Sequence, residues 1–369
     1  MKRVLKPMLT AAFALVLAAC GDGDKTASPR EQLLDRLAAS VADGKILYGH
    51  QDDLCYGHAW KVEDVAGDPL ERSDIRDVCG RFPAVAGFDL GALELGGTDN
   101  LDDVPFALMR RAALTHVSRG GIVTFSWHPW NPLTGENAWG MPAGRAVASV
   151  LPGGEKHELF QGWLKAVGDF FDTLRDADGN RIPLIFRPWH EHTGSWFWWG
   201  RDHCTVEEYV ALFRMTYDYL AVERGMDNIV WCYSPGHGAD EAMYLERWPG
   251  DDVVDLLGLD CYTYLGAEGI EAATAVYKAQ VGAALDYMTR LGQEKGKLIC
   301  LSETGLEGIP DPHWWTQTLY PTIQGAPIAY VLTWRNACDK PGHFYGPWKG
   351  FAHEEDFRQF AASEKIELL

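Results

Sequence analysis

Short apolar runs alternate with longer amphipathic segments along most of this 369-residue chain. Each run is bounded by polar, glycine or proline residues, which is the pattern of a strand buried on both faces. The sequence predicts eight such strands, at residues 45–49, 84–88, 122–127, 184–186, 229–233, 253–259, 298–301 and 328–334.

Between these runs, apolar residues recur at helical spacing. The predicted helices cover residues 29–42, 104–119, 155–175, 206–224 and 270–291. Buried strands that alternate with amphipathic helices indicate a parallel sheet covered by helices, and eight repeats predict a (β/α)8 TIM barrel, an α/β fold. We expect one barrel domain from residue 31 to residue 369. A doubly wound open sheet is the alternative fold, but the chain lacks the glycine-rich phosphate turn that such a sheet ordinarily carries.

Reactive and aromatic residues follow most of the predicted strands, whereas the strand starts are plain. Examples are Asp89, His128, Glu191, Tyr262, Glu303 and Trp334. In a barrel, the carboxyl ends of all strands meet at one face. These side chains are therefore expected to converge on one cleft.

The stretch from Ile185 to Gly200 holds the densest chemistry, because an apolar strand leads into Arg187, His190, Glu191 and five large aromatic residues. A carboxyl group can donate or accept a proton, and flat rings can stack on sugar faces. A core strand with an aromatic loop is the plainer interpretation. It would require the burial of several polar groups merely as packing, which is costly.

Glu303 ends another apolar strand in the same manner. Glycoside cleavage needs two carboxyl groups, one to protonate the leaving oxygen and one to attack or to activate water. Glu191 and Glu303 are the best such pair in the sequence. The alternative is a buried structural ion pair, with Arg187 or Arg335 as its partner.

The composition favours a neutral ligand. Acidic residues outnumber basic ones by 52 to 33, which gives a formal net charge of −19 and argues against a nucleic-acid partner. The chain also has 15 Trp. Many of them lie near predicted strand ends, which favours a ligand cleft over general use in the core: Trp127, Trp130, Trp189, Trp196, Trp198, Trp199 and Trp334.

The first residues are predicted to be an export signal. Residues 1–19 combine a basic start with the apolar run 8–19, which is too short to span a bilayer. The run ends in Leu17-Ala-Ala-Cys20, which resembles the bacterial lipoprotein cleavage box. We expect Cys20 to be acylated, residues 20–30 to form a flexible tether, and the protein to be anchored, with Gly21 favouring the outer membrane of a Gram-negative bacterium.

The other seven cysteines show no zinc spacing, and we expect neither a metal nor a cofactor. Cys232, Cys261 and Cys300 lie in apolar runs and are predicted to be small buried hydrophobes. For Cys55 and Cys79, a disulfide and two free thiols are equally compatible with the sequence.

Several of these motifs together resemble glycoside hydrolase family 26. The resemblance is carried by Arg187-Pro-Trp-His-Glu191 with Gly194-Ser-Trp-Phe-Trp-Trp-Gly200, Gly258-Leu-Asp-Cys-Tyr262, Ser302-Glu-Thr-Gly305, Tyr48-Gly-His-Gln51, Ser126-Trp-His-Pro129, Trp248-Pro-Gly-Asp251 and Thr333-Trp334. Most members of that family are endo-acting, retaining β-1,4-mannanases with a (β/α)8 fold.

The resemblance implies Glu191 as the acid/base and Glu303 as the nucleophile. It further implies that Tyr262 hydrogen-bonds the nucleophile, that His128 and His190 bind the sugar at the cleavage point, that Trp334 stacks beneath this sugar, and that Trp196 and Phe197 line the leaving-group side.

The sequence therefore predicts a monomeric, lipid-anchored retaining glycosidase acting on mannan, glucomannan or galactomannan. One alternative is a sister specificity of the same family, for β-1,3-xylan or mixed-linkage β-glucan. Another, from a different class, is a surface lipoprotein that binds carbohydrate without cleaving it.

Overall fold

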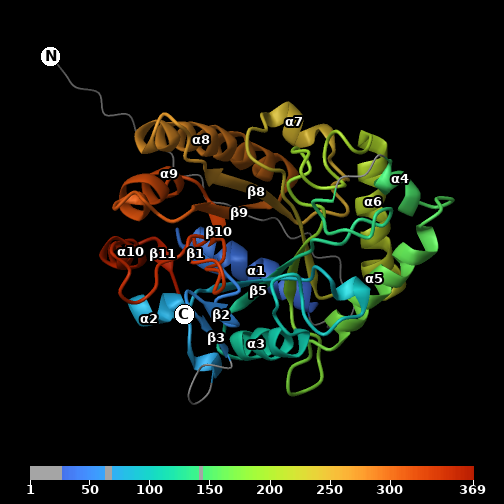
Figure 1. Ribbon diagram of the computed structural model, residues 1–369, viewed down its shortest axis with the longest axis horizontal. Coiled ribbons are helices and arrows are strands. Elements are labelled where there is room, and N and C mark those ends of the chain that lie inside the picture. The colour runs from blue at the N-terminus through green and yellow to red at the C-terminus, as the bar shows by residue number, and fades with distance from the viewer. Residues whose placement is uncertain (1–26, 63–68, 141–143) are drawn as a thin grey trace, which may run out of the picture.

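The computed structural model describes residues 27–62, 69–140 and 144–369 (Figure 1). Within these ranges, eight parallel strands form a closed barrel. They are β1 (Ile46–Gln51), β4 (Val85–Asp89), β5 (Ile122–Ser126), β6 (Leu184–Arg187), β7 (Ile229–Tyr233), β8 (Leu256–Thr263), β9 (Leu298–Leu306) and β10 (Ile328–Thr333).

The closure lies between the first and last of these strands. Leu47 of β1 pairs with Tyr330 of β10, and His50 pairs with Thr333, so the sheet has no free edge between them. The short β11 (Ile366–Glu367) adds to the start of β1. The predicted (β/α)8 barrel is confirmed, and the doubly wound sheet is excluded by the β1–β10 pairing.

The predicted strands match the observed ones closely. The largest differences are at β9, which continues to Leu306 instead of ending at residue 301, and at β8, which runs over Leu256–Thr263 instead of residues 253–259. A hairpin of β2 (Tyr56–Gly57) and β3 (Trp60–Lys61) follows β1 and had no counterpart among the predicted elements.

Helices surround the barrel (Figure 1). They are α1 (Pro29–Ala42), α2 (Asp74–Cys79), α3 (Phe106–Ser118), α4 (Ala146–Val150), α5 (His157–Asp172), α6 (Val206–Tyr217), α7 (Glu241–Glu246), α8 (Ile270–Lys295), α9 (Tyr320–Ile323) and α10 (Glu354–Ala361), with short 3-10 turns η2 (Pro69–Glu71) and η3 (Leu93–Leu95). The predicted helix at 206–224 is α6 with its π-helical continuation η4 (Asp218–Glu223), and a second π-helical turn, η5 (Trp314–Leu319), precedes α9. No helix in the described ranges is long and apolar enough to cross a membrane.

The barrel interior is closed at its amino-terminal end by α1. Leu33 and Leu37 of this helix pack with an inner layer of buried residues to which every barrel strand contributes. That layer includes Leu47, Val85, Ile122, Ile185, Val230, Leu256, Cys300 and Leu332. Because this end is filled with apolar side chains, polar chemistry is confined to the opposite, carboxyl-terminal face.

All seven cysteines in the described ranges carry free thiols. The Cys55–Cys79 disulfide is therefore not formed, and the second of the two possibilities that the sequence left open holds. Cys232, Cys261 and Cys300 are buried in the core, which confirms their predicted role.

The predicted signal peptide and Cys20 lie outside the described residues, so the lipid anchor stays a proposal. If it is correct, a radioactive fatty acid should label the wild-type protein and fail to label Cys20→Ala. Equal labelling of both proteins would contradict it.

Candidate active site

Glu191 and Glu303 meet at the carboxyl-terminal face of the barrel. Glu303 lies within β9, and Glu191 lies in the turn that follows β6. One carboxylate oxygen from each, together with one from Asp260 on β8, form a group whose members all lie within 4.8 Å of one another. The predicted pairing of the two glutamates is therefore present in the structure.

A β-bulge turns Glu303 toward the cleft. Leu259 of β8 pairs with Leu301 of β9, but the next residue, Asp260, pairs with Glu303, so Ser302 is the extra residue. By regular alternation, Glu303 would share the helix-facing side with Leu301, which packs in the outer core. The inserted residue shifts the alternation from this point on and brings Glu303 to the same side as Asp260.

The backbone at Glu191 has an unusual conformation. Trp189 and Glu191 have φ values of 56° and 54°, a region that costs energy for residues other than glycine. The turn is held by the Glu191 backbone N–H, which donates to the Ser234 carbonyl at 2.8 Å, and by the fully buried Trp189, whose indole N–H donates to Thr216 Oγ1. This tight turn places the Glu191 carboxyl group beside β9.

The environment of Glu191 favours its protonated form. Burial, followed by the nearby negative charge of Glu303, raises the pKa of Glu191 to about 7. The indole N–H of Trp196 donates to Glu191 Oε2 at 2.6 Å and opposes part of that rise. At neutral pH, a large fraction of Glu191 therefore carries the proton that a general acid needs.

Glu303 is surrounded by groups that stabilise a carboxylate. The Arg187 guanidinium forms an ion pair with Glu303 Oε1, and the Tyr262 hydroxyl donates to Oε2 at 2.6 Å. Arg187 also pairs with Asp260 at 2.7 Å, and burial raises the pKa of Asp260 well above its ordinary value. The predicted Tyr262 hydrogen bond is confirmed. The ion pair that the sequence offered as an alternative also exists, so Glu303 is both paired with Arg187 and close to Glu191.

Two buried histidines lie against the carboxylate pair. His128 Nδ1 contacts Asp89 Oδ2 at 2.7 Å, and its Nε2 lies 3.0 Å from His190 Nε2. Burial acts to lower the pKa of His128, but Asp89, Glu303 and Glu191 together raise it above its usual value. Burial and the Arg187 charge lower the pKa of His190 well below its usual value. These opposite shifts favour His128 as the donor and His190 as the acceptor in the contact between the two rings.

Comparison with known proteins agrees with this geometry. Residues 24–305, which are more than half of the chain, match glycosyl hydrolase family 26. The chain belongs to glycosyl hydrolase family 26. The family predicted from the motifs is thereby confirmed.

Several mannan-degrading proteins are similar to this family 26 chain. A mannan endo-1,4-β-mannosidase from Bifidobacterium adolescentis is 32% identical over 342 residues, covering 87% of this chain and 33% of that protein. A mannan endo-1,4-β-mannosidase from Bacillus subtilis strain 168 is 29% identical over 206 residues, covering 52% of this chain and 54% of that protein. This chain thus spans about a third to about half the length of these curated relatives.

Solved structures are similar to this chain over nearly its whole length. A GH26 β-mannanase from Bacteroides ovatus has 45% sequence identity and a TM-score of 0.86, with 92% of this chain and 94% of that chain covered. An endo-β-1,4-mannanase from Cellulomonas fimi has 30% identity and a TM-score of 0.79, with 93% and 78% covered.

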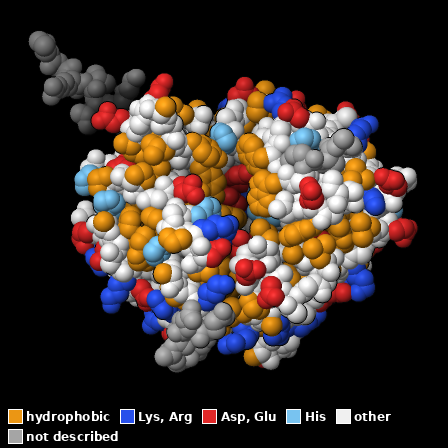
Figure 2. All heavy atoms as spheres, in the orientation of Figure 1, with side chains coloured by type: hydrophobic (Ala, Val, Ile, Leu, Met, Phe, Trp, Pro, Cys, Tyr) orange, Lys and Arg blue, Asp and Glu red, His pale blue; other side chains and the backbone are white. Residues whose placement is uncertain are grey.

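A cleft opens over the carboxylate pair. Figure 2 shows a hollow at the centre of one face, with hydrophobic side chains on its walls and acidic side chains in its depth. One part of this cleft, of about 360 Å³, is lined by Glu191, Trp196, His237 and Tyr264. Trp334, at the end of β10, is partly exposed, and its ring lies edge-on to His128 at 6.3 Å.

Most of the tryptophans assigned to the cleft are in fact core residues. Trp127, Trp189, Trp198 and Trp199 are fully buried, so the prediction that they line a ligand cleft is wrong. Trp127 alternates to the helix-facing side of β5, where its ring stacks on Phe160 of α5. The indole N–H of Trp199 donates to the His190 carbonyl at 2.8 Å and supports the site from below.

Phe197 does not line the leaving-group side as the family resemblance implied. Its side chain is only 3% exposed, and its ring packs against His128, His190 and Trp199. It therefore supports the histidine pair from within. Trp196 lines the hollow beside Glu191.

Trp139 is a site residue that sequence reasoning missed. It is 45% exposed, and its ring is stacked on His128 with centroids 5.1 Å apart and planes 13° apart. It lies in an irregular loop after β5, away from any strand end. Only its neighbourhood in space places it at the site.

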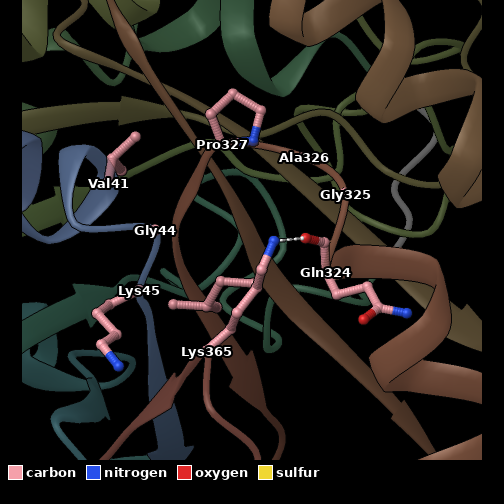
Figure 3. Close-up of a pocket in the computed structure, with 9 residues that line it drawn as sticks. Val41, Gly44, Lys45, Gln324, Gly325, Ala326, Pro327 and Lys365 are labelled. Atoms are coloured by element: carbon pink, nitrogen blue, oxygen red, sulfur yellow. Dashed lines mark hydrogen bonds between the residues drawn. The ribbon is translucent and has the colours of Figure 1, made fainter.

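A second hollow, of about 210 Å³, lies at the opposite end of the barrel (Figure 3). Both of its lysines already have partners, because Lys365 Nζ donates to the Gln324 carbonyl at 2.6 Å and Lys45 Nζ donates to the Glu364 carbonyl at 2.6 Å. No carboxylate lines it. This hollow takes no part in the chemistry of the carboxylate pair.

Proposed function

We propose that this family 26 protein is a retaining endo-β-1,4-mannanase with Glu191 as acid/base and Glu303 as nucleophile. The observation that carries the proposal is the closeness of the two carboxylates, because an oxygen of Glu191 lies within 4.8 Å of an oxygen of Glu303. Retaining glycosidases hold their carboxyl groups about 5–5.5 Å apart, whereas inverting enzymes leave room for a water between them. The choice of mannan rests on the names of the similar proteins.

In the first step, a Glu303 oxygen forms a bond to the anomeric carbon as the glycosidic C–O bond breaks. The bonding electrons leave with the glycosidic oxygen, which takes the Glu191 proton. The Arg187 guanidinium and the Tyr262 hydroxyl orient the two oxygens of Glu303 until it attacks. The products are a glycosyl ester on Glu303 and a free leaving sugar.

In the second step, Glu191, now a carboxylate, removes a proton from water. The water oxygen bonds to the anomeric carbon from the side that the leaving group occupied, and the ester bond to Glu303 breaks. Glu303 is restored as a carboxylate and Glu191 as an acid. The stereochemistry at the anomeric carbon is retained.

We propose that His128, His190 and Trp334 hold the sugar at the cleavage point. The His128 ring is fixed by Asp89 at one nitrogen and by His190 at the other. Trp334 lies beside them with part of its ring exposed, as a platform for a sugar face requires.

Reducing-sugar release tests the function and its alternatives. The protein should release reducing ends from glucomannan and galactomannan much faster than from β-1,3-xylan or mixed-linkage β-glucan. A mixture of long oligosaccharides in the first minutes would indicate internal cutting, and mannobiose alone would indicate cutting from a chain end. Binding of mannan without any hydrolysis would instead support the carbohydrate-binding lipoprotein.

The pKa of Glu191 predicts an alkaline limb in the pH profile. Because the acid form of Glu191 is required and its pKa is about 7, kcat/KM should be lost as pH rises through about 7. Above that pH, the rate should fall about tenfold per pH unit. Initial rates of mannopentaose hydrolysis between pH 5 and pH 9 measure this limb.

The Trp196→Phe variant tests this assignment. The indole N–H of Trp196 stabilises the ionised form of Glu191, so its removal should raise the pKa of Glu191 and move the alkaline limb to higher pH. An alkaline limb at the same pH as in wild type, or at a lower pH, would contradict the assignment of this limb to Glu191.

A further inference from the structure

His192 directly follows Glu191, yet its side chain leads away from the cleft. Glu191 lines the hollow over the carboxylate pair, whereas the His192 ring is completely buried. That ring lies between Tyr209 of α6 and Tyr233 of β7, with ring centroids 4.2 Å and 4.9 Å away. Because the two residues share one backbone turn, a His192 ring that is fixed in the core restricts the directions in which the Glu191 carboxyl group can point.

A hydrogen bond fixes the His192 ring to β7. Its Nε2 lies 3.0 Å from the Tyr233 hydroxyl oxygen, and that hydroxyl donates its only hydrogen to the Tyr244 carbonyl at 2.7 Å. The Tyr233 oxygen therefore accepts from His192, and Nε2 carries a hydrogen. Burial, followed by the Arg247 charge, lowers the pKa of His192 well below its usual value, so the ring is neutral at pH 7. A neutral ring with one N–H thus anchors the turn.

The turn needs such anchors because its backbone is strained. The φ values of 56° at Trp189 and 54° at Glu191 persist in residues other than glycine only where the surroundings impose them. The Tyr209 hydroxyl donates to the Trp189 carbonyl at 2.9 Å. The Glu191 N–H donates to the Ser234 carbonyl at 2.8 Å. These two bonds restrain the turn before Glu191 and at Glu191, and the His192 side chain restrains it afterwards.

We propose that His192 is a positioning residue for Glu191, whose carboxyl group it aims at the leaving oxygen through the bond to the Tyr233 hydroxyl. The completely buried ring cannot reach the substrate, so it acts only through Glu191. This inference rests on the proposed function, because it takes Glu191 as the acid/base. Misplacing a catalytic group by about 1 Å can lower the rate about 100-fold, so a loosened turn should be visible in the kinetics.

Two substrates that differ in their need for an acid test this role. Mannopentaose releases a sugar oxygen that must take a proton, whereas 2,4-dinitrophenyl β-mannobioside releases a stable phenolate. His192→Phe keeps a ring in the core and removes the N–H. It should lower kcat/KM for mannopentaose about tenfold and leave kcat/KM for the aryl glycoside within about twofold of wild type. The ratio of the two values does not depend on the amount of folded protein.

A rescue, a matched control and a second background complete the test. His192→Gln can place an amide N–H near the position of the ring Nε2, so it should restore most of the wild-type ratio. His116→Phe should keep the wild-type ratio, because His116 is also fully buried but contacts the Ala84 carbonyl at the amino-terminal end of the barrel. Added to Glu191→Ala, His192→Phe should cause no further loss on mannopentaose, because its effect passes through Glu191.

The outcomes separate this inference from the proposed function. A wild-type ratio in His192→Phe, or an equal loss on both substrates, would overturn the positioning role and leave the mannanase intact. A further loss in the Glu191→Ala background would overturn it as well. If His192→Phe does not fold, Tyr233→Phe, which removes the accepting hydroxyl, should show the same fall in the ratio. Failure of the unchanged protein to cleave either substrate would overturn the proposed function and the inference together.

Discussion

Glu303→Ala should lower kcat/KM for glucomannan by about 10⁴-fold or more, because the variant lacks the group that we propose bonds to the anomeric carbon. Initial rates of reducing-sugar release measure the loss. Glu303→Gln, which keeps the shape of the side chain, should show a loss of similar size. A residual rate within about tenfold of wild type in both variants would remove Glu303 from the role of nucleophile.

Azide distinguishes the roles of the two glutamates. With 4-nitrophenyl β-mannobioside as substrate, azide can occupy the space vacated in Glu303→Ala and attack from the nucleophile's side, which yields the α-mannosyl azide. In Glu191→Ala, the ester on Glu303 still forms, and azide attacks it from the opposite side to yield the β-anomer. NMR of the products identifies each anomer. The reverse assignment of anomers would exchange the two roles, and the same anomer from both variants would contradict the mechanism.

Arg187→Met should destabilise the fold by about 3–5 kcal/mol, because it leaves the buried carboxylates of Asp260 and Glu303 without their shared cation. Both carboxylates are almost completely buried, so water cannot replace the guanidinium. Unfolding in urea, followed by circular dichroism, measures the change in the free energy of unfolding.

Arg290→Met is the matched control. Arg290 pairs with Glu241 on the surface, where both side chains are substantially exposed, so its loss should leave the urea midpoint unchanged within error. If Arg187→Met does not fold, Arg187→Lys provides the measurement, because a single ammonium cannot reproduce the two-sided contact of the guanidinium. A wild-type midpoint for an Arg187 variant would contradict the predicted cost of removing this cation.

The fold and the two central glutamates could be predicted from local patterns. Each barrel strand is a run of apolar residues between polar ones, and the helices follow from spacing, so both are readable along the chain. The convergence of strand ends at one face follows from the parallel topology, which brings Glu191 and Glu303 to the same region before their contact is known.

The directions in which individual side chains point were harder to predict from the sequence. Regular alternation predicts that Trp127 faces the helices, yet its position near a strand end suggested the cleft, and the structure shows that alternation decides. Alternation fails at Glu303, because Ser302 forms a bulge that no local sequence pattern indicates. The difference is that alternation is a property of one strand, whereas a bulge depends on pairing with its neighbour.

The sequence by itself determined the barrel, the family and the choice of Glu191 and Glu303 as the candidate carboxylate pair. Each of these depends on short-range periodicity or on contiguous motifs. Only the tertiary structure decided how the site is completed. The Trp139 ring stacked on His128 and the contacting rings of His237 and Tyr264 beside Glu191 come from separate loops. The Arg187 cation between Asp260 and Glu303 joins three strands. Such contacts link residues far apart in the chain, and packing in three dimensions is what selects them.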